Sequence, residues 1–345
     1  MILPNTYASA LLLIILSMLC WGSWANTFKL TRNWRFELFY YDYSLGVLLA
    51  ALIAAYTFGS MGSELSFADN MLVAGKRNMA YAVAGGMVFN LANMLLVAAI
   101  SVAGLAVAFP VGIGLALVIG VIWNYLLDPQ GNPMLLTAGV VLVACAIVVD
   151  SLAYGAHAQA MNPDSGRGRR RRSASSKGIT LSLVSGVLMG SFYPLVEMGK
   201  GSGPDSGGLG PYAVAFLFAI GVFVSTFVYN LYFLNLPVQG EPLSMLDYFK
   251  GKLGEHGLGV LGGLIWCAGA ITNFVAASAP KRVQVGPAVS YAVGQGATMV
   301  SALWGVLVWK EFAGASGKVK TLLTLMFVLF IAGLALVSVA PLYVH

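Results

Sequence analysis

Long apolar runs follow one another along almost the whole chain, and short polar or glycine-rich segments separate them. Most runs have about 20 residues, the length at which an α-helix crosses the hydrocarbon core of a bilayer. A membrane-spanning segment must satisfy its own backbone hydrogen bonds, which favours helices over open strands. The pattern predicts ten spans, at 7–26, 41–60, 79–99, 103–126, 134–154, 179–198, 211–236, 258–279, 285–309 and 322–340.

The composition supports a membrane protein. Apolar residues make up 59% of the 345 residues and charged residues only 9%, whereas charged residues are about 25% of a typical soluble domain. This excludes a soluble enzyme, a disordered protein and a secreted disulfide scaffold. The first run lacks the basic segment that precedes the apolar core of a signal peptide, so we expect it to be a retained span.

Basic residues are unevenly distributed between the two sides of the predicted membrane. Connections on one side hold five of the 19, namely Lys76, Arg77, Lys200, Lys281 and Arg282. The rest lie on the other side, many of them in the arginine-rich segment 157–178. Because lysine and arginine favour the cytoplasmic side, we expect both termini outside and this segment in the cytoplasm, in a plasma membrane or a bacterial inner membrane. The segment is a topology anchor or binds anionic lipid or a regulatory partner, and no nucleic-acid partner is expected.

Short motifs recur in the same order in the two halves of the chain. The matched pairs are Gly22-Ser23-Trp24 with Gly190-Ser191-Phe192, Gly85-Gly86 with Gly262-Gly263, Asn93 with Asn273, and Gly112 and Gly114 with Gly294 and Gly296. Each half has five spans, an odd number, so the halves must run in opposite directions, as in many secondary transporters. Chance matching among 41 glycines is the alternative. We expect a first repeat at 1–156, a basic linker at 157–178 and a second repeat at 179–345.

A few polar side chains lie in the middle of the predicted spans. They are Asn90 and Asn93 in the third span, Asn273 in the eighth, and Tyr291 and Gln295 in the ninth. Such groups are costly in lipid, so we expect them to face another helix or a cavity. Amide and hydroxyl groups donate and accept hydrogen bonds, which suits a neutral polar solute. Interhelical hydrogen bonding is the alternative for each of them.

The fourth span contains a proline, and aromatic residues lie near these polar positions. Pro110 removes one backbone hydrogen bond and clashes with the preceding turn, which predicts a helix break or a packing kink. A break would free backbone carbonyls to meet a solute. Trp24, Phe109, Tyr193 and Tyr291 are candidates to stack on a planar solute, although a tryptophan near a span end is also typical of the membrane interface.

Ionisable side chains within the spans are few. Glu197, in the sixth span with Tyr193 and Pro194, is the candidate for proton coupling, and a solvated carboxylate near the interface is the alternative. We predict that Asp42 and Asp150 lie near span ends, and that His157, His256 and His345 lie in loops or at the chain end. No phosphate-binding glycine loop is present. We therefore expect no catalytic residue, no cofactor and no metal site.

Several motifs resemble those of the plant ureide permeases and their bacterial relatives. They are Trp21-Gly22-Ser23-Trp24, Asp42-Tyr43-Ser44, Ala84-Gly85-Gly86, Asn124 to Asp128, and Trp304-Gly305-Val306 followed by Glu311. The chain is more remotely similar to glucose and rhamnose porters, and all of these belong to the drug/metabolite transporter superfamily. The resemblance implies ten helices in two inverted five-helix repeats and, in the plant branch, proton-coupled transport of allantoin and related nucleobases. The central segment 157–178 departs from the longer plant segment and lacks its nucleotide-binding-like motif.

The residues and the resemblance together predict a secondary transporter. We expect proton-coupled uptake of a small neutral solute, ureide-like or nucleobase-like, by alternating access. The expected partners are the solute, a coupling proton or other ion and the lipid bilayer, and a homodimer is left open. The alternatives are a monosaccharide porter, a multidrug or metabolite exporter, and a non-transporting membrane enzyme or sensor. We predict that Asn93→Ala abolishes uptake without preventing membrane insertion.

Overall fold

The computed structural model is built from helices, and ten of its helical segments are long and apolar enough to span a membrane. The structure describes the chain except residues 32–33, 63, 104, 162–175, 202–206, 238–240, 281–282, 284 and 344–345. The predicted all-α class and the predicted number of spans are confirmed. The long helices are α1 (Tyr7–Ser23), α3 (Phe36–Tyr56), α5 (Lys76–Ala103), α6 (Leu105–Leu127), α7 (Pro133–Met161), α9 (Ser176–Lys200), α10 (Pro211–Asn235), α11 (Leu253–Ala276) and α14 (Gly317–Val339).

The remaining span and several connections are made of shorter helices. Span one continues from α1 into α2 (Ala25–Leu30), and span nine combines α12 (Pro287–Gly294), α13 (Ala297–Leu303) and the π-helical turn η3 (Trp304–Val308). Span ten ends in η4 (Ala340–Leu342). Two further short helices, α4 (Phe67–Val73) and η1 (Met245–Lys250), connect spans two and three and spans seven and eight.

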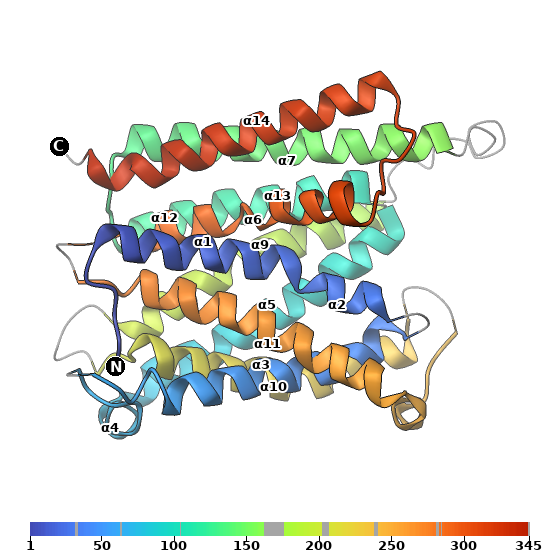
Figure 1. The fold of residues 1–345 in the computed structure, drawn as a ribbon. Helices are drawn as coiled ribbons and strands as arrows, with labels where there is room; N and C mark the ends of the chain where they lie inside the picture. The colour runs from blue at the N-terminus through green and yellow to red at the C-terminus, as the bar shows by residue number, and fades with distance from the viewer. Residues whose placement is uncertain are drawn as a thin grey trace.

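Successive spans run in opposite directions, and both termini lie at the same end of the bundle (Figure 1). We name this the terminal end. The opposite end carries Lys29, Lys250, Lys252 and Lys310, and we name it the basic end. Most of the basic segment 157–178 falls on residues 162–175, outside the described residues. Helix α7 continues to Met161 and α9 begins at Ser176, so both helices extend into the predicted linker.

The packing contacts between spans recur when five is added to, or subtracted from, the number of each span. Helix α5 packs on α9 as α11 packs on α1, and α5 packs on α10 as α11 packs on α3. Helix α6 packs on α9 as span nine packs on α1. The pairs α7 with α14, α3 with α10 and α6 with α12 are their own counterparts under this shift. This contact pattern is consistent with an inverted repeat, and the division of the chain at 1–156, 157–178 and 179–345 stays a prediction.

Glycines set the close approach of repeat-related helix pairs. A Cβ atom on Gly263 of α11 would lie 2.0 Å from the carbonyl oxygen of Tyr43 in α3. A Cβ on Gly86 of α5 would lie 2.0 Å from the carbonyl oxygen of Phe218 in α10. Small residues let membrane helices approach to backbone contact. Gly86 and Gly263 are one of the pairs matched from the sequence, and they occupy equivalent positions in the two halves.

The predicted helix break at Pro110 is not observed. Helix α6 runs through Pro110 from Leu105 to Leu127. Pro110 cannot donate to the carbonyl of residue 106, and the helix continues through it without this one hydrogen bond. The interruption lies instead in the repeat-related ninth span, where α12 ends at Gly294 and α13 begins at Ala297. Gln295 and Gly296 make short-range turn contacts there, from Gln295 N to Ala292 O (3.2 Å) and from Gly296 N to Val293 O (2.9 Å).

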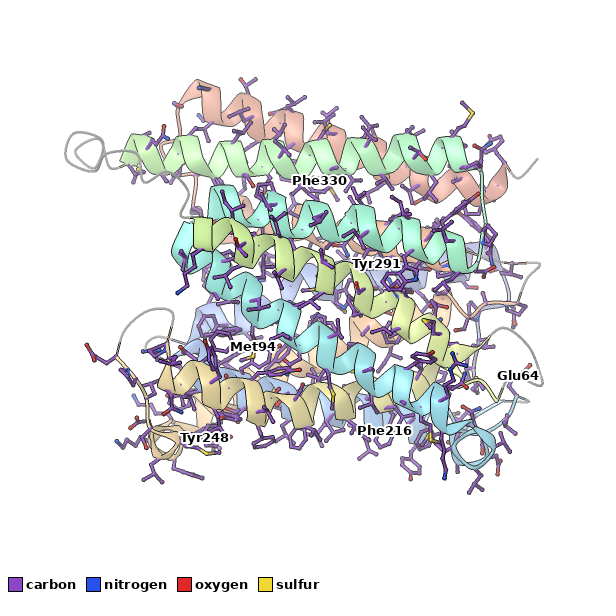
Figure 2. The ribbon with its side chains drawn as sticks, turned by 180° about the vertical axis from the view of Figure 1, so that it is seen from behind. Glu64, Met94, Phe216, Tyr248, Tyr291 and Phe330 are labelled. Atoms are coloured by element: carbon purple, nitrogen blue, oxygen red, sulfur yellow. The ribbon has the colours of Figure 1, made fainter. Side chains whose placement is uncertain are left out.

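Two spans begin earlier than the hydropathy pattern predicted and span five ends later, so two of the histidines lie in helices. Helix α3 begins at Phe36 and α11 at Leu253 because their first turns hold acidic residues, which the helix N-terminus stabilises. His256 lies in α11 and His157 in α7, so the expectation that both lie in loops is wrong. Figure 2 shows Tyr248 on η1 at the edge of the bundle and Phe330 between α14 and α7.

Candidate functional site

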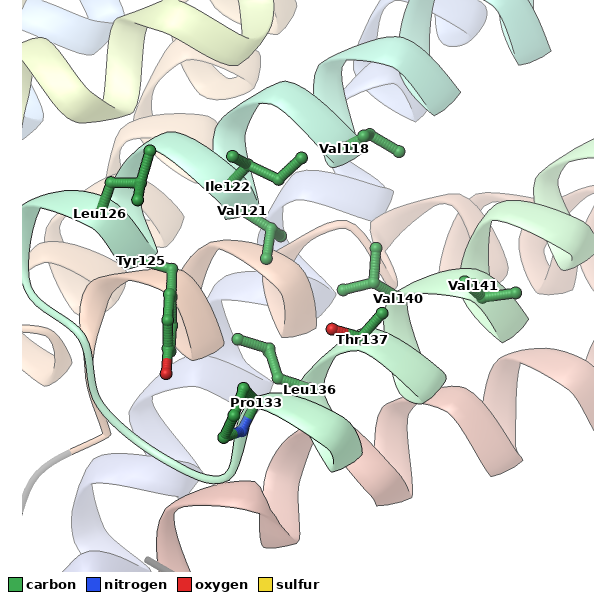
Figure 3. A pocket seen from close by; sticks show the side chains of 10 residues that line it. All are labelled: Val118, Val121, Ile122, Tyr125, Leu126, Pro133, Leu136, Thr137, Val140 and Val141. Carbon is green, nitrogen blue, oxygen red and sulfur yellow. The ribbon is translucent and has the colours of Figure 1, made fainter.

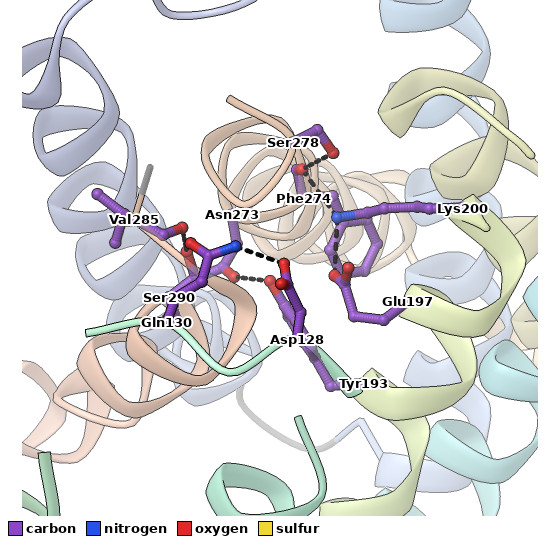
Figure 4. A network of polar contacts seen from close by, with 10 residues as sticks. All are labelled: Asp128, Gln130, Tyr193, Glu197, Lys200, Asn273, Phe274, Ser278, Val285 and Ser290. Atoms are coloured by element: carbon purple, nitrogen blue, oxygen red, sulfur yellow. Dashed lines mark hydrogen bonds and ion pairs between the residues drawn. The ribbon is translucent and has the colours of Figure 1, made fainter. Parts of the chain in front are cut away.

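Asn273 lies at the centre of a buried hydrogen-bond network between four helices. Its side chain is 0% exposed. Its Oδ1 accepts a hydrogen bond from the Tyr193 hydroxyl (2.6 Å), and its Nδ2 donates to Ser17 Oγ and to the Ser290 carbonyl (3.1 Å each). We name Asn273, Tyr193, Ser17 and Ser290 the Asn273 network. It joins α11, α9, α1 and α12, so two of the predicted site residues, Asn273 and Tyr193, are brought together (Figure 4).

Tyr291 packs beside this network. It is fully buried, and its ring centroid lies 5.3 Å from that of Tyr193. Its hydroxyl lies 3.2 Å from the carbonyl oxygen of Ala116 and 3.3 Å from that of Met189. The single hydroxyl proton is therefore shared between α6 and α9. Tyr291 thus links span nine to both helices that face it.

A second group, which contains the predicted residues Trp24 and Asn93, lies nearer the basic end. The ring centroids of Trp24 and Tyr43 are 4.8 Å apart, and those of Tyr40 and Tyr43 are 4.9 Å apart. Asn93 Nδ2 donates to the Tyr40 hydroxyl at 3.0 Å. We name these four residues the Trp24 cluster. The Tyr43 side chain is fully buried, and its hydroxyl has no hydrogen-bond partner among the described residues, so it is free to bind a polar group.

Two tryptophans connect the Trp24 cluster to the Asn273 network. The ring of Trp266 lies 6.4 Å from Tyr43 and stacks on Trp21 at 6.0 Å. Trp21 Nε1 donates to the Trp266 carbonyl at 3.2 Å. A Cβ on Gly294, at the interruption of span nine, would lie 2.7 Å from Trp21 and 3.2 Å from Asn273 Nδ2. The cluster and the network therefore form one continuous seam of aromatic and polar side chains between the two halves.

Three predicted residues lie at other places. Asn90 is fully buried, and its Nδ2 contacts the Val222 carbonyl, Ser225 Oγ and Thr226 Oγ1 of α10 at 2.7–3.2 Å. These contacts fit the alternative prediction that Asn90 forms hydrogen bonds to a neighbouring helix. Gln295 is half-buried at the interruption of span nine, and Phe109 is half-buried on α6. The roles of all three in binding stay predictions.

Glu197 has a charged partner. Its Oε1 lies 2.7 Å from Lys200 Nζ, and the two side chains are only 13% and 9% exposed. Lys200 Nζ also donates to the Phe274 carbonyl at 3.3 Å. Asp128, at the end of α6, lies beside this pair at the terminal end (Figure 4). Glu197 is therefore a paired carboxylate rather than a solvated one, and its assignment to proton coupling stays a prediction.

A second charged group closes the basic end. Lys29 of α2 forms an ion pair with Glu311, which follows η3, and Tyr154 of α7 donates to Glu311 Oε2 at 3.0 Å. We name these three residues the basic-end cluster. Trp309 Nε1 donates to Asn26 Oδ1 at 2.6 Å across the same spans. Spans one and nine are thus tied at the basic end, and their counterparts, spans six and four, end beside the Glu197–Lys200 pair at the terminal end.

The sequence analysis missed several of these residues. Tyr40, Tyr43 and Trp266 were not predicted site residues, although Tyr40 and Tyr43 are three apart and therefore share a helix face. Lys29 served only as a topology marker, and Glu311 only as part of a family motif. The signal that could have identified Tyr43 is its place in another family motif, Asp42-Tyr43-Ser44.

The seam is shielded from solvent in this conformation, since Tyr43, Tyr193, Asn273 and Tyr291 are all 0% exposed. A pocket of about 250 Å³ lies elsewhere, between α6 and α7 (Figure 3). Its lining is apolar apart from Tyr125 and Thr137, which does not suit a polar solute. Within the part of the chain that the structure describes, no three ligand-type side chains of His, Cys, Asp or Glu gather in a group that could hold a metal ion.

Ten spans around a shielded polar seam define a polytopic membrane protein of the transporter class. The ureide permease family model matches residues 39–178 and 169–340, and the chain belongs to the ureide permease family. It is 25% identical to ureide permease 1 and 26% identical to ureide permease 2 of Arabidopsis thaliana. These alignments cover 97% of this chain, and 97% and 98% of the two relatives. Its relatives are permeases, so the chain is a transporter and not an enzyme.

Other matches agree with this assignment. A probable ureide permease of Vigna unguiculata is 30% identical over 38% of this chain and 36% of its own length. A solved crystal structure, described only as a protein, matches with a TM-score of 0.64 over 95% of this chain and 96% of that one. Its sequence identity is 18%, so this likeness concerns the fold alone. The predicted fold class is thereby supported independently of hydropathy.

Proposed function

We propose that this chain takes up a ureide, such as allantoin, or a related nucleobase across a plasma membrane or bacterial inner membrane. The observation that carries the proposal is the seam, in which amide and hydroxyl groups alternate with aromatic rings between the two halves. A ureide is a neutral solute with several N–H and C=O groups, so it needs donors and acceptors as well as a flat apolar surface. The relatives are named ureide permeases, which supports the same solute class.

The proposed binding residues divide between the two groups in the seam. Asn93 and Trp24, with Tyr43, would hold the solute at the Trp24 cluster, and Asn273, Tyr193 and Tyr291 would shape the adjoining wall. Gln295, beside the interruption of span nine, would supply a further amide. Phe109 and Asn90 remain candidates from the sequence, and the contacts of Asn90 with α10 favour a packing role.

Alternating access follows from the two charged groups. Spans one and nine are tied by the Lys29–Glu311 pair at the basic end, and span six holds the Glu197–Lys200 pair at the terminal end. Opening one end while the other stays closed exposes the seam to one side at a time. We place the basic end in the cytoplasm because lysine and arginine favour that side, and we propose a proton gradient as the driving force.

Competition in reconstituted vesicles tests the solute class. Purified protein in proteoliposomes is expected to exchange external labelled allantoin for internal unlabelled allantoin, and excess ureides or nucleobases are expected to compete. Inhibition by monosaccharides and not by ureides would instead identify a sugar porter. A loss of labelled drug from loaded vesicles without allantoin exchange would identify an exporter.

Asn93→Ala is expected to reduce allantoin uptake about 5- to 150-fold, because losing a hydrogen bond to a buried polar group costs about 1–3 kcal/mol. Its thermal midpoint is expected to fall less than that of Asn90→Ala, since among the described residues Asn93 bonds only to the buried Tyr40 hydroxyl, whereas Asn90 contacts three groups of α10. Asn90→Ala is the matched control, and we expect it to lower the thermal midpoint while the KM for allantoin stays unchanged. Unchanged uptake by Asn93→Ala would remove Asn93 from the binding site.

A further inference from the structure

Asp150 is a buried carboxylate that the transport model above leaves without a role. It lies on α7, about 16 Å along the helix axis from the end at Met161. Its side chain is 5% exposed, and its Oδ1 has no hydrogen-bond partner among the described residues. An ionised carboxylate is costly in such surroundings unless it is paired. Asp150 is therefore in the surroundings that favour binding of a proton.

The other two carboxylates singled out within the spans are compensated. Glu197 pairs with Lys200 at 2.7 Å. Asp42 accepts hydrogen bonds from the Tyr248 hydroxyl (2.5 Å) and from His256 Nδ1 (2.8 Å). Each of these carboxylates has a donor that stabilises its charged form. Asp150 has no such donor on Oδ1, and this separates it from both.

We infer that Asp150 binds the coupling proton of this transporter and releases it toward the basic end. The inference rests on the proposed function, because it assumes that transport is coupled to protons. Tyr154 lies four residues further along α7 and therefore on the same face. The Tyr154 hydroxyl already donates to Glu311 Oε2 at 3.0 Å. Asp150 is thus one helical turn from a hydrogen-bonded chain that reaches Lys29, which is 41% exposed at the basic end.

Proton release along these hydrogen bonds conserves protons and charge. The proton on the Asp150 carboxyl passes to the Tyr154 oxygen, directly or through one water, as the Tyr154 hydroxyl proton passes to the Glu311 carboxylate. The tyrosine is unchanged, Asp150 becomes ionised, and Glu311 becomes neutral. A neutral Glu311 no longer forms an ion pair with Lys29, so the step loosens the tie between spans one and nine. Glu311 then gives its proton to water and the pair forms again.

The charged and titratable groups around this position are few. On α7 itself they are Tyr154 and His157, whose Nε2 lies 2.8 Å from the Glu311 carbonyl oxygen. The segment after η3 brings Lys310 and Glu311, and α2 brings Lys29. Helix α14 brings Lys318 and Lys320, which are both exposed at its start. The described parts of α13 and η3 bring no ionisable side chain, and α6 brings only Tyr125, near its other end.

Asp150→Asn separates coupling from solute binding. In proteoliposomes with a proton gradient, we expect this variant to lose allantoin accumulation at least about tenfold, within the usual range of coupling between two sites. In counterflow at equal pH we expect exchange within about twofold of wild type, because a neutral side chain mimics the protonated state. Asp150→Glu is expected to retain accumulation with a shifted pH profile. Asp150→Asn that accumulates like wild type, or that elutes as a folded protein and loses both activities, would overturn the inference.

Two controls and one solute-independent measurement complete the test. Asp247→Asn makes the same change on η1, where the Lys250 ammonium holds the pKa of Asp247 below its ordinary value, and we expect both activities to be unchanged. Glu197→Gln tests the rival carboxylate, and loss of accumulation there with normal accumulation in Asp150→Asn would favour Glu197. If Asp150→Asn does not fold, an unshifted pH profile of Asp150→Glu overturns the inference.

Infrared spectroscopy of the purified protein distinguishes a failed inference from a failed function. A protonated-carboxyl band that is present in wild type and shifted in Asp150→Glu supports proton binding by Asp150 with any solute. An identical band in both proteins contradicts it. Wild-type vesicles that exchange no allantoin would refute the proposed function while this band still decides the role of Asp150.

Discussion

Gly263→Ala is expected to destabilise the folded protein by about 1–3 kcal/mol, whereas Gly257→Ala in the same helix leaves it unchanged or slightly more stable. The added methyl at position 263 would lie 2.0 Å from the Tyr43 carbonyl oxygen and 2.7 Å from the Val47 nitrogen, so α11 and α3 must move apart. At position 257 nothing lies within 4 Å of the added methyl, and alanine is the better helix former. The same substitution should therefore lower stability at position 263 and not at position 257 of the same helix.

The thermal midpoint of the purified protein, followed by size-exclusion chromatography after heating, measures this difference. Gly86→Ala extends the test to the first half, because its methyl would lie 2.0 Å from the Phe218 carbonyl oxygen. If the halves are related as the contacts indicate, Gly86→Ala and Gly263→Ala lower the midpoint by similar amounts. Equal midpoints for Gly257→Ala and Gly263→Ala would contradict the close helix approach. A loss at only one of positions 86 and 263 would contradict their equivalence.

Much of the fold could be predicted because lipid imposes a simple rule. Each span must be helical, apolar and about 20 residues long, so hydropathy alone identified ten of them. The starts of α3 and α11 were placed too late because Glu37, Glu255 and His256 lower the local hydropathy although they belong to the helices. The matched glycines also carried information, since Gly86 and Gly263 are sites of backbone contact between helices.

The site was harder to predict because it depends on which helix faces which. Asn273 was identified because an amide in the middle of a span needs a partner, but its partners lie 256, 80 and 17 residues away in the sequence. Asn90 and Asn93 share one pattern in the sequence, yet Asn90 bonds to α10 and Asn93 to Tyr40 of α3. The proline at position 110 suggested a break, but α6 runs through it and the interruption lies at Gln295 and Gly296 of the repeat-related span nine, where no proline marks it in the sequence.

Asn273→Ala is expected to cost several kcal/mol of stability, since it leaves the Tyr193 hydroxyl, Ser17 Oγ and the Ser290 carbonyl without their shared partner, at about 1–3 kcal/mol for each buried group left unpaired. The matched control is Asn235→Ala on α10. Asn235 is exposed, and among the described residues its side chain bonds only to the Leu231 carbonyl of its own helix. We therefore expect the thermal midpoint of Asn273→Ala to fall markedly and that of Asn235→Ala to stay within error of wild type.

Solute-induced stabilisation then decides whether Asn273 binds the solute or only joins the helices. A ligand that binds the folded protein raises its thermal midpoint according to its concentration and Kd. We expect allantoin to raise the midpoint of wild type and of Asn235→Ala, and to leave that of Asn273→Ala unchanged at the same concentration. If allantoin still raises the midpoint of Asn273→Ala by the wild-type amount, Asn273 acts through packing alone. We then expect the hydrogen bonds to the solute to come from Gln295 and from the Trp24 cluster, where the Tyr43 hydroxyl has no partner among the described residues.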